Sequence, residues 1–137
     1  MKSFSYIPEI RFADIDAMGH VNNAVYLTYF EQTRIHFFHA VAGGKWDWNE
    51  LGILVAKSEI NYFKPVHLGD IVEIKTYCVH FGTKSFSVKY ELWRGEELCT
   101  TGVAVLVCFN HNEKVTIEMP ELWRSRLQEY FIEVPKA

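Results

Sequence analysis

The sequence predicts an α+β protein, in which a curved antiparallel sheet wraps around one long central helix and a short helix follows at the C-terminal end. Two patterns predict this fold class. One stretch in the first third repeats apolar residues at helical spacing, and most of the remainder is long strand-like segments joined by short turns. Successive strands with short connections form antiparallel sheets, and one curved sheet around one helix buries both. With 137 residues, the chain has room for a single domain over residues 1–137.

The first expected elements are a strand over residues 3–12, SFSYIPEIRF, and a helix over residues 24–41. Apolar residues of this helix fall at spacings of three, seven and four, which places them on one face: Leu27, Phe30, Phe37 and Val41. A helix this apolar is expected to be wrapped by other elements. The pair Gly43–Gly44 follows it and favours a helix end there.

Long strands are expected to make up most of the remaining chain. Their ranges are 53–63, 71–81, 86–92 and 98–109. The Arg94–Glu96 stretch, which contains a glycine, indicates a hairpin between the last two, and residues 120–131 form the closing helix, with Pro120 in its first turn. Such a sheet has edges, which proteins cover or pair with a second subunit. We therefore expect a homodimer, or a tetramer built as a dimer of dimers.

Composition limits the classes of partner. The chain is 49% hydrophobic and 23% charged, and its net charge of -3 argues against a nucleic-acid partner, which needs a broad positive field. The three cysteines are well separated along the chain, which suits reduced, buried thiols better than disulfides. No secretory apolar block and no run of membrane-spanning length is present. We expect a cytoplasmic protein without a membrane partner.

The stretch DIDAMGHVNN, residues 14–23, places many polar groups directly before the apolar helix. Capping explains part of it: Asn22 or Asn23 can accept bonds from the free N–H groups of the helix, and Gly19 can supply a turn. Both aspartates can also interact with the positive end of the helix dipole. One cap residue would suffice, however, and this stretch offers two carboxylates, an imidazole and two amides.

The same arrangement suits acyl transfer. Unpaired N–H groups at a helix start can hold the oxygen of a carbonyl as negative charge develops on it. A carboxylate a few residues upstream could attack that carbonyl or activate a water molecule to do so. Hydrolysis of a thioester is one reaction of this kind.

The segment RFADIDAMGHVNNAVYLTYFEQTR resembles the opening signature of hotdog-fold thioesterases of the 4-hydroxybenzoyl-CoA thioesterase superfamily, particularly the bacterial acyl-CoA thioesterases. The resemblance continues through EINYFKPVHLGDIVEI and GTKSFSVKYEL, so it covers most of the chain. It implies a hotdog fold and an enzyme that hydrolyses an acyl-CoA to a free carboxylic acid and coenzyme A. Coenzyme A would then be part of the substrate, and no resident cofactor is implied.

The resemblance also implies roles for single residues. Asp16, the second aspartate of the D-x-D pair, matches the catalytic carboxylate, acting as general base or as nucleophile. The backbone amide of Asn23 matches the group that polarises the thioester carbonyl, and Gly19 matches a position of close backbone approach. Residues expected to contact substrate are His20, Asn22, Tyr26, Phe63, Lys84 and Ser85, with Lys84 near the coenzyme A phosphates. His36 and His39 share a helix face without a third ligand, so no metal site is expected.

Other functions remain open from the sequence. An acyl-carrier-protein thioesterase is a rival, because H-V-N-N also resembles a segment of those enzymes, and a basic patch at the pocket mouth would favour it. A non-catalytic acyl-binding hotdog protein could keep the fold, although it could readily discard Asp16. A hotdog dehydratase or hydratase would need an acid–base histidine in a motif that the sequence does not show. The acyl group itself cannot be assigned from sequence.

Overall fold

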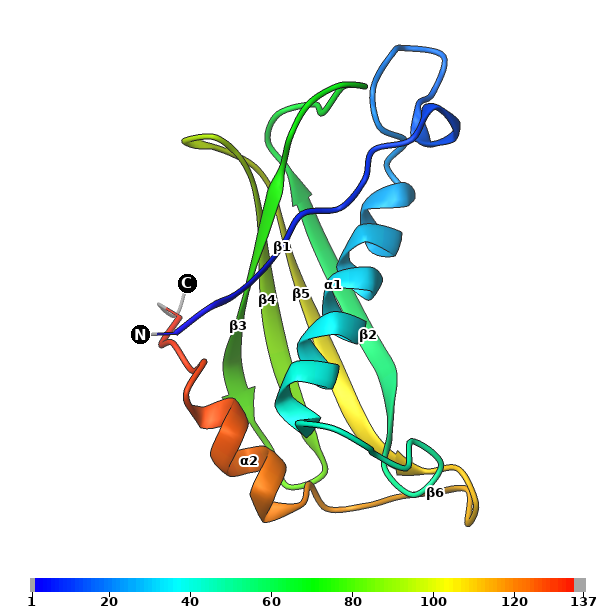
Figure 1. Cartoon of the computed structure of the whole chain (residues 1–137), viewed down its shortest axis with the longest axis vertical. Helices are drawn as coiled ribbons and strands as arrows, with labels where there is room; N and C mark the ends of the chain where they lie inside the picture. The colour runs from blue at the N-terminus through cyan, green and yellow to red at the C-terminus, as the bar shows by residue number, and fades with distance from the viewer. Residues whose placement is uncertain (1, 135–137) are drawn as a thin grey trace.

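The computed structural model describes residues 2–134. Within them, an antiparallel sheet of six strands curves around the long helix α1 (Val25–Ala42), and the short helix α2 (Glu121–Gln128) lies at one end (Figure 1). The strands are β1 (Phe4–Tyr6), β2 (Gly52–Tyr62), β3 (Glu73–Phe81), β4 (Ser85–Arg94), β5 (Glu97–Asn110) and β6 (Val115–Thr116). Their order is β1-β3-β4-β5-β2, and β6 pairs with β5. This arrangement confirms the predicted fold class.

The register of the central strands defines two ends of the sheet. Thr100 of β5 pairs with Tyr62 of β2 on one side and with Leu92 of β4 on the other. The helix α1 begins at the same end, as shown by the hydrogen bond that the Tyr62 hydroxyl donates to the Asn23 carbonyl oxygen at 2.8 Å. We call it the Tyr62 end. The opposite end carries the turn before β4 and the helix α2 (Figure 1).

Large aromatic rings hold α1 against the sheet. Phe30 stacks on Tyr90 of β4 with ring centroids 4.7 Å apart, and both side chains are buried. The close approach depends on Gly102 of β5, where a Cβ atom would lie 2.7 Å from the Phe30 ring. Further along the helix, Phe38 packs against Trp123 of α2 at 5.6 Å. The packing of α1 therefore depends on close contacts of individual aromatic rings.

Several boundaries differ from the prediction. The first strand covers only Phe4–Tyr6, because Pro8 lacks the N–H that a ladder needs, and a short 3-10 helix, η1 (Phe12–Asp14), follows. The strand β6 was not predicted, since two residues are too short to show periodicity. All three cysteines are free and buried, as expected.

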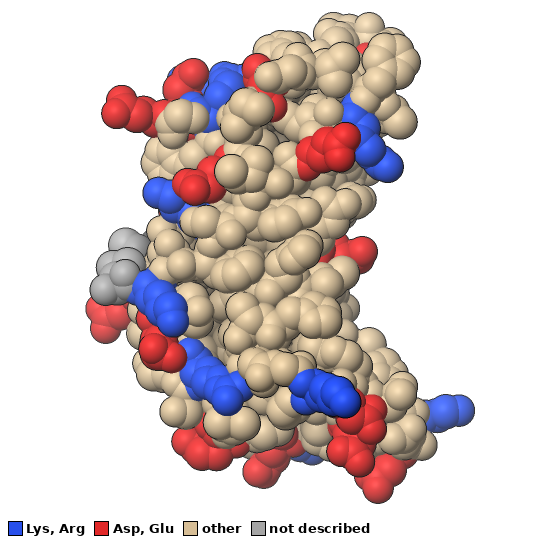
Figure 2. All heavy atoms as spheres, viewed as in Figure 1, with Lys and Arg blue, Asp and Glu red and all other residues tan. Residues whose placement is uncertain are grey.

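One side of α1 stays open in the single chain. Leu27, predicted on the buried face, is 46% exposed, and Ile35 is 48% exposed. Both line the groove between α1 and the edge strand β2, where Val55 is 46% exposed. Figure 2 shows a band with few charges across the middle of this face. Within residues 2–134, no helix is long and apolar enough to cross a membrane.

Candidate active site

A tight turn presents Asp16 before the start of α1. Its Oδ1 accepts hydrogen bonds from the N–H groups of Met18 at 2.9 Å and His20 at 3.2 Å, and its own N–H donates to the His20 carbonyl oxygen at 2.8 Å. Gly19 has φ +81°, a conformation that favours glycine, and nothing lies within 4 Å of where its Cβ would be. Gly19 therefore serves the turn. Among residues 2–134, no group donates to Oδ2 of the half-buried Asp16, so that oxygen is free.

Asp14, two residues earlier, is buried and holds the turn in place. Its carboxylate accepts from the Tyr29 hydroxyl at 2.8 Å, from the Arg11 N–H at 3.0 Å and from the Arg11 guanidinium at 3.3 Å. Burial raises the pKa of Asp14, but these hydrogen bonds outweigh it and leave the pKa below its ordinary value. Asp14 is thus an ionised group that supports the turn.

The two asparagines have different surroundings. The Asn22 side chain accepts from the Ala24 N–H at 3.0 Å and its carbonyl accepts from the Val25 N–H at 2.9 Å, so Asn22 satisfies donors near the helix start. The Asn23 carbonyl accepts from Tyr62. In the described part of the chain, the Asn23 N–H donates to no acceptor. It is available to a ligand, as its predicted role requires.

These groups meet in a cavity of about 200 Å³ at the Tyr62 end. It is lined by Asp16, His20, Val21, Asn23, Tyr26, Tyr62, Phe63, Lys64 and Pro65. Five of the predicted site residues are therefore brought together: Asp16, His20, Asn23, Tyr26 and Phe63. Gly19 and Asn22 belong to the supporting turn and do not line the cavity. Burial raises the pKa of the Tyr26 and Tyr62 hydroxyls, which keeps them as hydrogen-bond donors at neutral pH.

Lys84 and Ser85 are not part of this cavity within one chain. Ser85 pairs with Val107, whereas the Tyr62 end of β4 is marked by Leu92, which pairs with Thr100. Seven residues along β4 separate the two positions, or about 23 Å at the rise of a strand. The resemblance to the family, and not the pattern of strands and turns, implied that both residues lie near the substrate. A role for them in binding stays a prediction that requires a second chain.

Sequence reasoning missed Tyr62 and Lys64, which also line the cavity. Both flank Phe63, which was predicted, so adjacency was the available signal. Lys64 Nζ forms an ion pair with Glu97 at 2.7 Å, and this lysine lowers the pKa of the exposed Glu97 carboxyl. Within residues 2–134, no cluster of three or more His, Cys, Asp or Glu side chains could hold a metal ion.

The family follows from comparison with known proteins. A model of the Thioesterase-like superfamily matches residues 10–127, which include the turn, α1 and all of the cavity. The chain belongs to this superfamily. As a member, it is a thioester hydrolase, which the sequence predicted, and its curved sheet around one helix is the hotdog fold.

Three relatives of this thioesterase show how broad the likeness is. A thioesterase from Thermus thermophilus, solved with coenzyme A and Zn, is 33% identical to this chain and superposes on it with a TM-score of 0.82. The match covers 95% of this chain and 96% of the Thermus chain. YsmA of Bacillus subtilis is 29% identical over 109 residues, 77% of this chain and 73% of that protein. An acyl-CoA thioester hydrolase of Buchnera aphidicola is 26% identical over 81 residues, 59% of this chain and 56% of that protein.

Proposed function

We propose that this thioesterase hydrolyses an acyl-CoA to a free carboxylic acid and coenzyme A. One observation carries the proposal: the Asp16 carboxylate and the Asn23 N–H share one cavity at a helix start, and within residues 2–134 neither Asp16 Oδ2 nor that N–H has a hydrogen-bond partner. Coenzyme A as the thiol is supported by the relatives, since the Thermus thioesterase was solved with coenzyme A and the Buchnera relative is named an acyl-CoA thioester hydrolase.

In the first form of the mechanism, Asp16 is a general base. Its free Oδ2 takes a proton from a water molecule as the water oxygen forms a bond to the thioester carbon. The carbonyl oxygen becomes an oxyanion, which the Asn23 N–H stabilises at the positive end of α1. When the oxyanion collapses, the carbon–sulfur bond breaks, and the sulfur of coenzyme A leaves with the proton that Asp16 had taken.

In the second form, Asp16 is a nucleophile. Oδ2 attacks the thioester carbon, coenzyme A leaves as a thiolate that is then protonated from solvent, and an acyl-aspartate anhydride remains. Water hydrolyses the anhydride, releasing the acid and restoring the carboxylate. Both forms need the same free oxygen and the same N–H donor, so the geometry supports either.

The residues that line the cavity favour acyl-CoA as the substrate over an acyl group attached to a carrier protein. Among residues 2–134, Lys64 is the one lysine or arginine that lines the cavity, and its charge is paired with Glu97. A basic patch at the mouth was the feature expected for an acyl-carrier-protein enzyme. The buried ring of Tyr26 and the half-exposed ring of Phe63 can contact the acyl group.

A homodimer completes this proposal. The edge strand β2 exposes Leu54 and Val55, and the groove beside it exposes Leu27 and Ile35 of α1. A second copy that pairs along β2 would cover this apolar face and remove the open edge. Pairing two antiparallel edges also brings opposite sheet ends together, which is how Lys84 of one chain could reach the cavity of the other. Two such dimers could form a tetramer.

Asp16→Asn tests the proposal cleanly. Asparagine keeps an oxygen at Oδ1, so the bonds from the Met18 and His20 N–H groups survive, while the base or nucleophile is lost. We expect the fold to be retained and hydrolysis of acyl-CoA to fall by about 10²–10⁴-fold. Thiol release from short, long and aromatic acyl-CoAs gives the rate and also identifies the preferred acyl group.

Asp47→Asn is the matched control. The Asp47 Oδ1 also accepts from the N–H two residues later, Asn49, at 2.9 Å, but in the exposed loop after α1. This variant should hydrolyse as fast as the wild-type protein. Near-normal turnover by Asp16→Asn would refute the role of Asp16, and a wild-type protein inactive on every acyl-CoA would refute the proposed function.

A further inference from the structure

One wall of the cavity is a segment that has left the sheet. After β2 ends, the N–H groups of Phe63 and Lys64 both donate to the Cys99 carbonyl oxygen, at 2.8 and 3.1 Å. Pro65 follows and has no N–H to continue the ladder. Residues 63–67 are called the wall segment here, and past Lys64 this segment depends on contacts other than the sheet ladder for its position.

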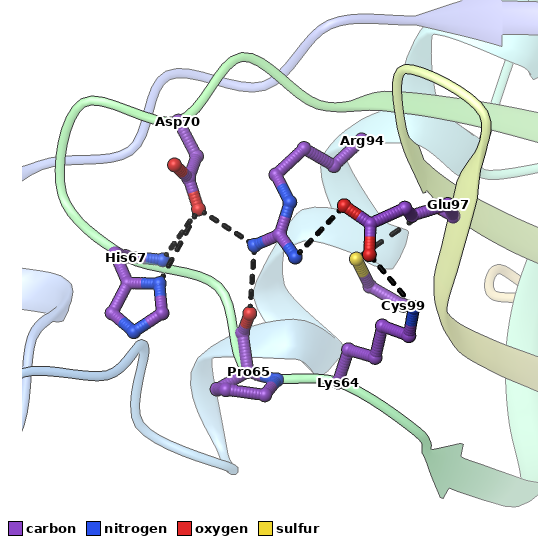
Figure 3. Close-up of polar contacts among 7 residues, drawn as sticks. All are labelled: Lys64, Pro65, His67, Asp70, Arg94, Glu97 and Cys99. Carbon is purple, nitrogen blue, oxygen red and sulfur yellow. Dashed lines mark hydrogen bonds and ion pairs between the residues drawn. The ribbon is translucent and has the colours of Figure 1, made fainter.

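Arg94, at the end of β4, supplies these contacts (Figure 3). Its Nη1 donates to the Pro65 carbonyl oxygen at 2.9 Å and to Asp70 Oδ2 at 3.0 Å. The same Asp70 oxygen accepts from the His67 N–H at 2.9 Å. In the described chain, Arg94 is the one donor to the Pro65 carbonyl. One guanidinium nitrogen and one carboxylate oxygen thus fix both halves of the wall segment.

The wall segment is in turn paired with the catalytic turn. The Val21 N–H donates to the Val66 carbonyl oxygen at 2.7 Å, and Val66 is fully buried. His20 and His67 form a β-bridge, with their rings edge to face at 5.0 Å. The His20 N–H donates to Asp16 Oδ1, and the His20 carbonyl oxygen accepts from the Asp16 N–H, so a shift of the wall segment reaches Asp16 through a chain of hydrogen bonds.

We propose that Arg94 is a positioning residue for thioester hydrolysis: it holds the wall segment, and through it the turn that carries Asp16. This role rests on the proposed function. We call the bonds of Arg94 to Pro65 and Asp70 its inner contacts. Its outer contact is a 3.5 Å ion pair with Glu97, whose side chain is 48% exposed. Exposed ion pairs contribute little to stability. The inner contacts, in contrast, involve the side chains of Arg94 and Asp70, which are three-quarters buried.

The charge state of Asp70 agrees with this role. The His67 N–H has the largest effect and lowers the pKa of Asp70; burial raises it, and the Arg94 side chain lowers it again, so that the pKa stays below its ordinary value. Asp70 is therefore ionised at neutral pH and binds the guanidinium as a charge-assisted pair. Arg94 itself lines no cavity with Asp16 and contacts no group that reacts.

The test compares Arg94→Ala with the wild-type protein in acyl-CoA hydrolysis. Misplacement of a catalytic group by about 1 Å costs about 100-fold. We expect kcat to fall by about 10–100-fold on that basis, with a smaller change in KM. Arg94→Lys should recover part of the loss, and added guanidinium ion, but not sodium at equal ionic strength, should restore kcat in Arg94→Ala. A purely structural role would lower thermal stability without rescue of kcat by guanidinium.

Arg126→Ala is the matched control, because the Arg126 guanidinium also donates to main-chain carbonyl oxygens, those of Val41 and Ala42, but at the C-terminal end of α1, away from the cavity. It should keep wild-type kcat. If Arg94→Ala fails to fold, Asp70→Asn decides, since it keeps the side-chain shape and removes the charge that binds Arg94; kcat should again fall. Wild-type kcat in Asp70→Asn, or in a folded Arg94→Ala, would overturn the role of Arg94. Activity of the wild-type protein separates this outcome from failure of the proposed function.

Discussion

Replacing Tyr29 by phenylalanine removes one hydroxyl from the contact that joins α1 to the turn that carries Asp16. That hydroxyl donates to the Asp14 carboxylate at 2.8 Å, and Asp14 is only 4% exposed. Burial and the neighbouring Asp14 charge raise the pKa of Tyr29, so the hydroxyl keeps its proton and the bond is always made at neutral pH. The ring of Tyr29 and its packing are unchanged in the variant.

The magnitude follows from the charge of the acceptor. Hydrogen bonds to charged groups contribute about 1.5–3 kcal/mol, and the Asp14 carboxylate would keep its bonds from Arg11. We expect the variant to lose about 2 kcal/mol of unfolding free energy, which for a chain of this size lowers Tm by about 8 °C. The rate of acyl-CoA hydrolysis should fall less than in Asp16→Asn, because the substitution removes no group that is proposed to react.

The loss should depend on pH in a defined direction. The pKa of Asp14 in the folded protein lies below 3.8, its ordinary value, so ionised Asp14 stabilises the fold above about pH 4. That stabilisation is lost as the pH falls through the lower, folded-state pKa. The difference between the variant and the wild-type protein should therefore be complete at neutral pH and should shrink at acid pH, as the pH falls below 3.8 and through the lowered folded-state pKa of Asp14.

Thermal unfolding followed by tryptophan fluorescence at both pH values measures this effect. Tyr6→Phe is the control, since Tyr6 is half-buried and its hydroxyl makes no hydrogen bond within residues 2–134. A Tm within about 1 °C of wild type for Tyr29→Phe at neutral pH, or a difference that is undiminished at low pH, would show that the buried bond does not hold the turn.

Two further predictions concern packing and assembly. Gly102→Ala should cost about 1–3 kcal/mol in chemical denaturation, because the new Cβ would lie 2.7 Å from the Phe30 ring, and Phe30→Leu in the same chain should recover part of it. Val55→Lys places a charge on the exposed edge of β2. In sedimentation, the wild-type protein should be a dimer and this variant a monomer with reduced activity. A variant that stays dimeric, or a monomeric wild-type protein, would contradict the proposed dimer.

Local patterns predicted the elements well. Spacing in the sequence located α1, the four long strands and the hairpin at Gly95, because each pattern depends on neighbours a few residues apart. It misplaced Leu27, since helical spacing shows which residues share a face but not whether a second copy covers it. It overextended the first strand past Pro8, where the chain leaves the ladder.

The site was predictable where it is local and only partly elsewhere. Asp16, His20 and Asn23 lie within eight residues of one another, so a single motif identified them. Phe63 came from a second motif. The contact of Arg94 with Pro65 depends on β4 ending beside the wall segment, which only the three-dimensional register shows. The position of Lys84 at the other end of the sheet likewise comes from the strand register and not from the motif that contains it.

The turn around Asp16 has a consequence for how new substrate preferences could arise. Two main-chain N–H groups bind Oδ1, and within residues 2–134 no side chain donates to either carboxylate oxygen of Asp16, so hydrogen bonds inside the turn set the direction in which Oδ2 faces. Rings proposed to border the acyl group, such as Phe63, could then be exchanged while the turn keeps these bonds. Under the proposed mechanism, reactivity and selectivity are physically separable, so one scaffold can diversify while its chemistry stays constant.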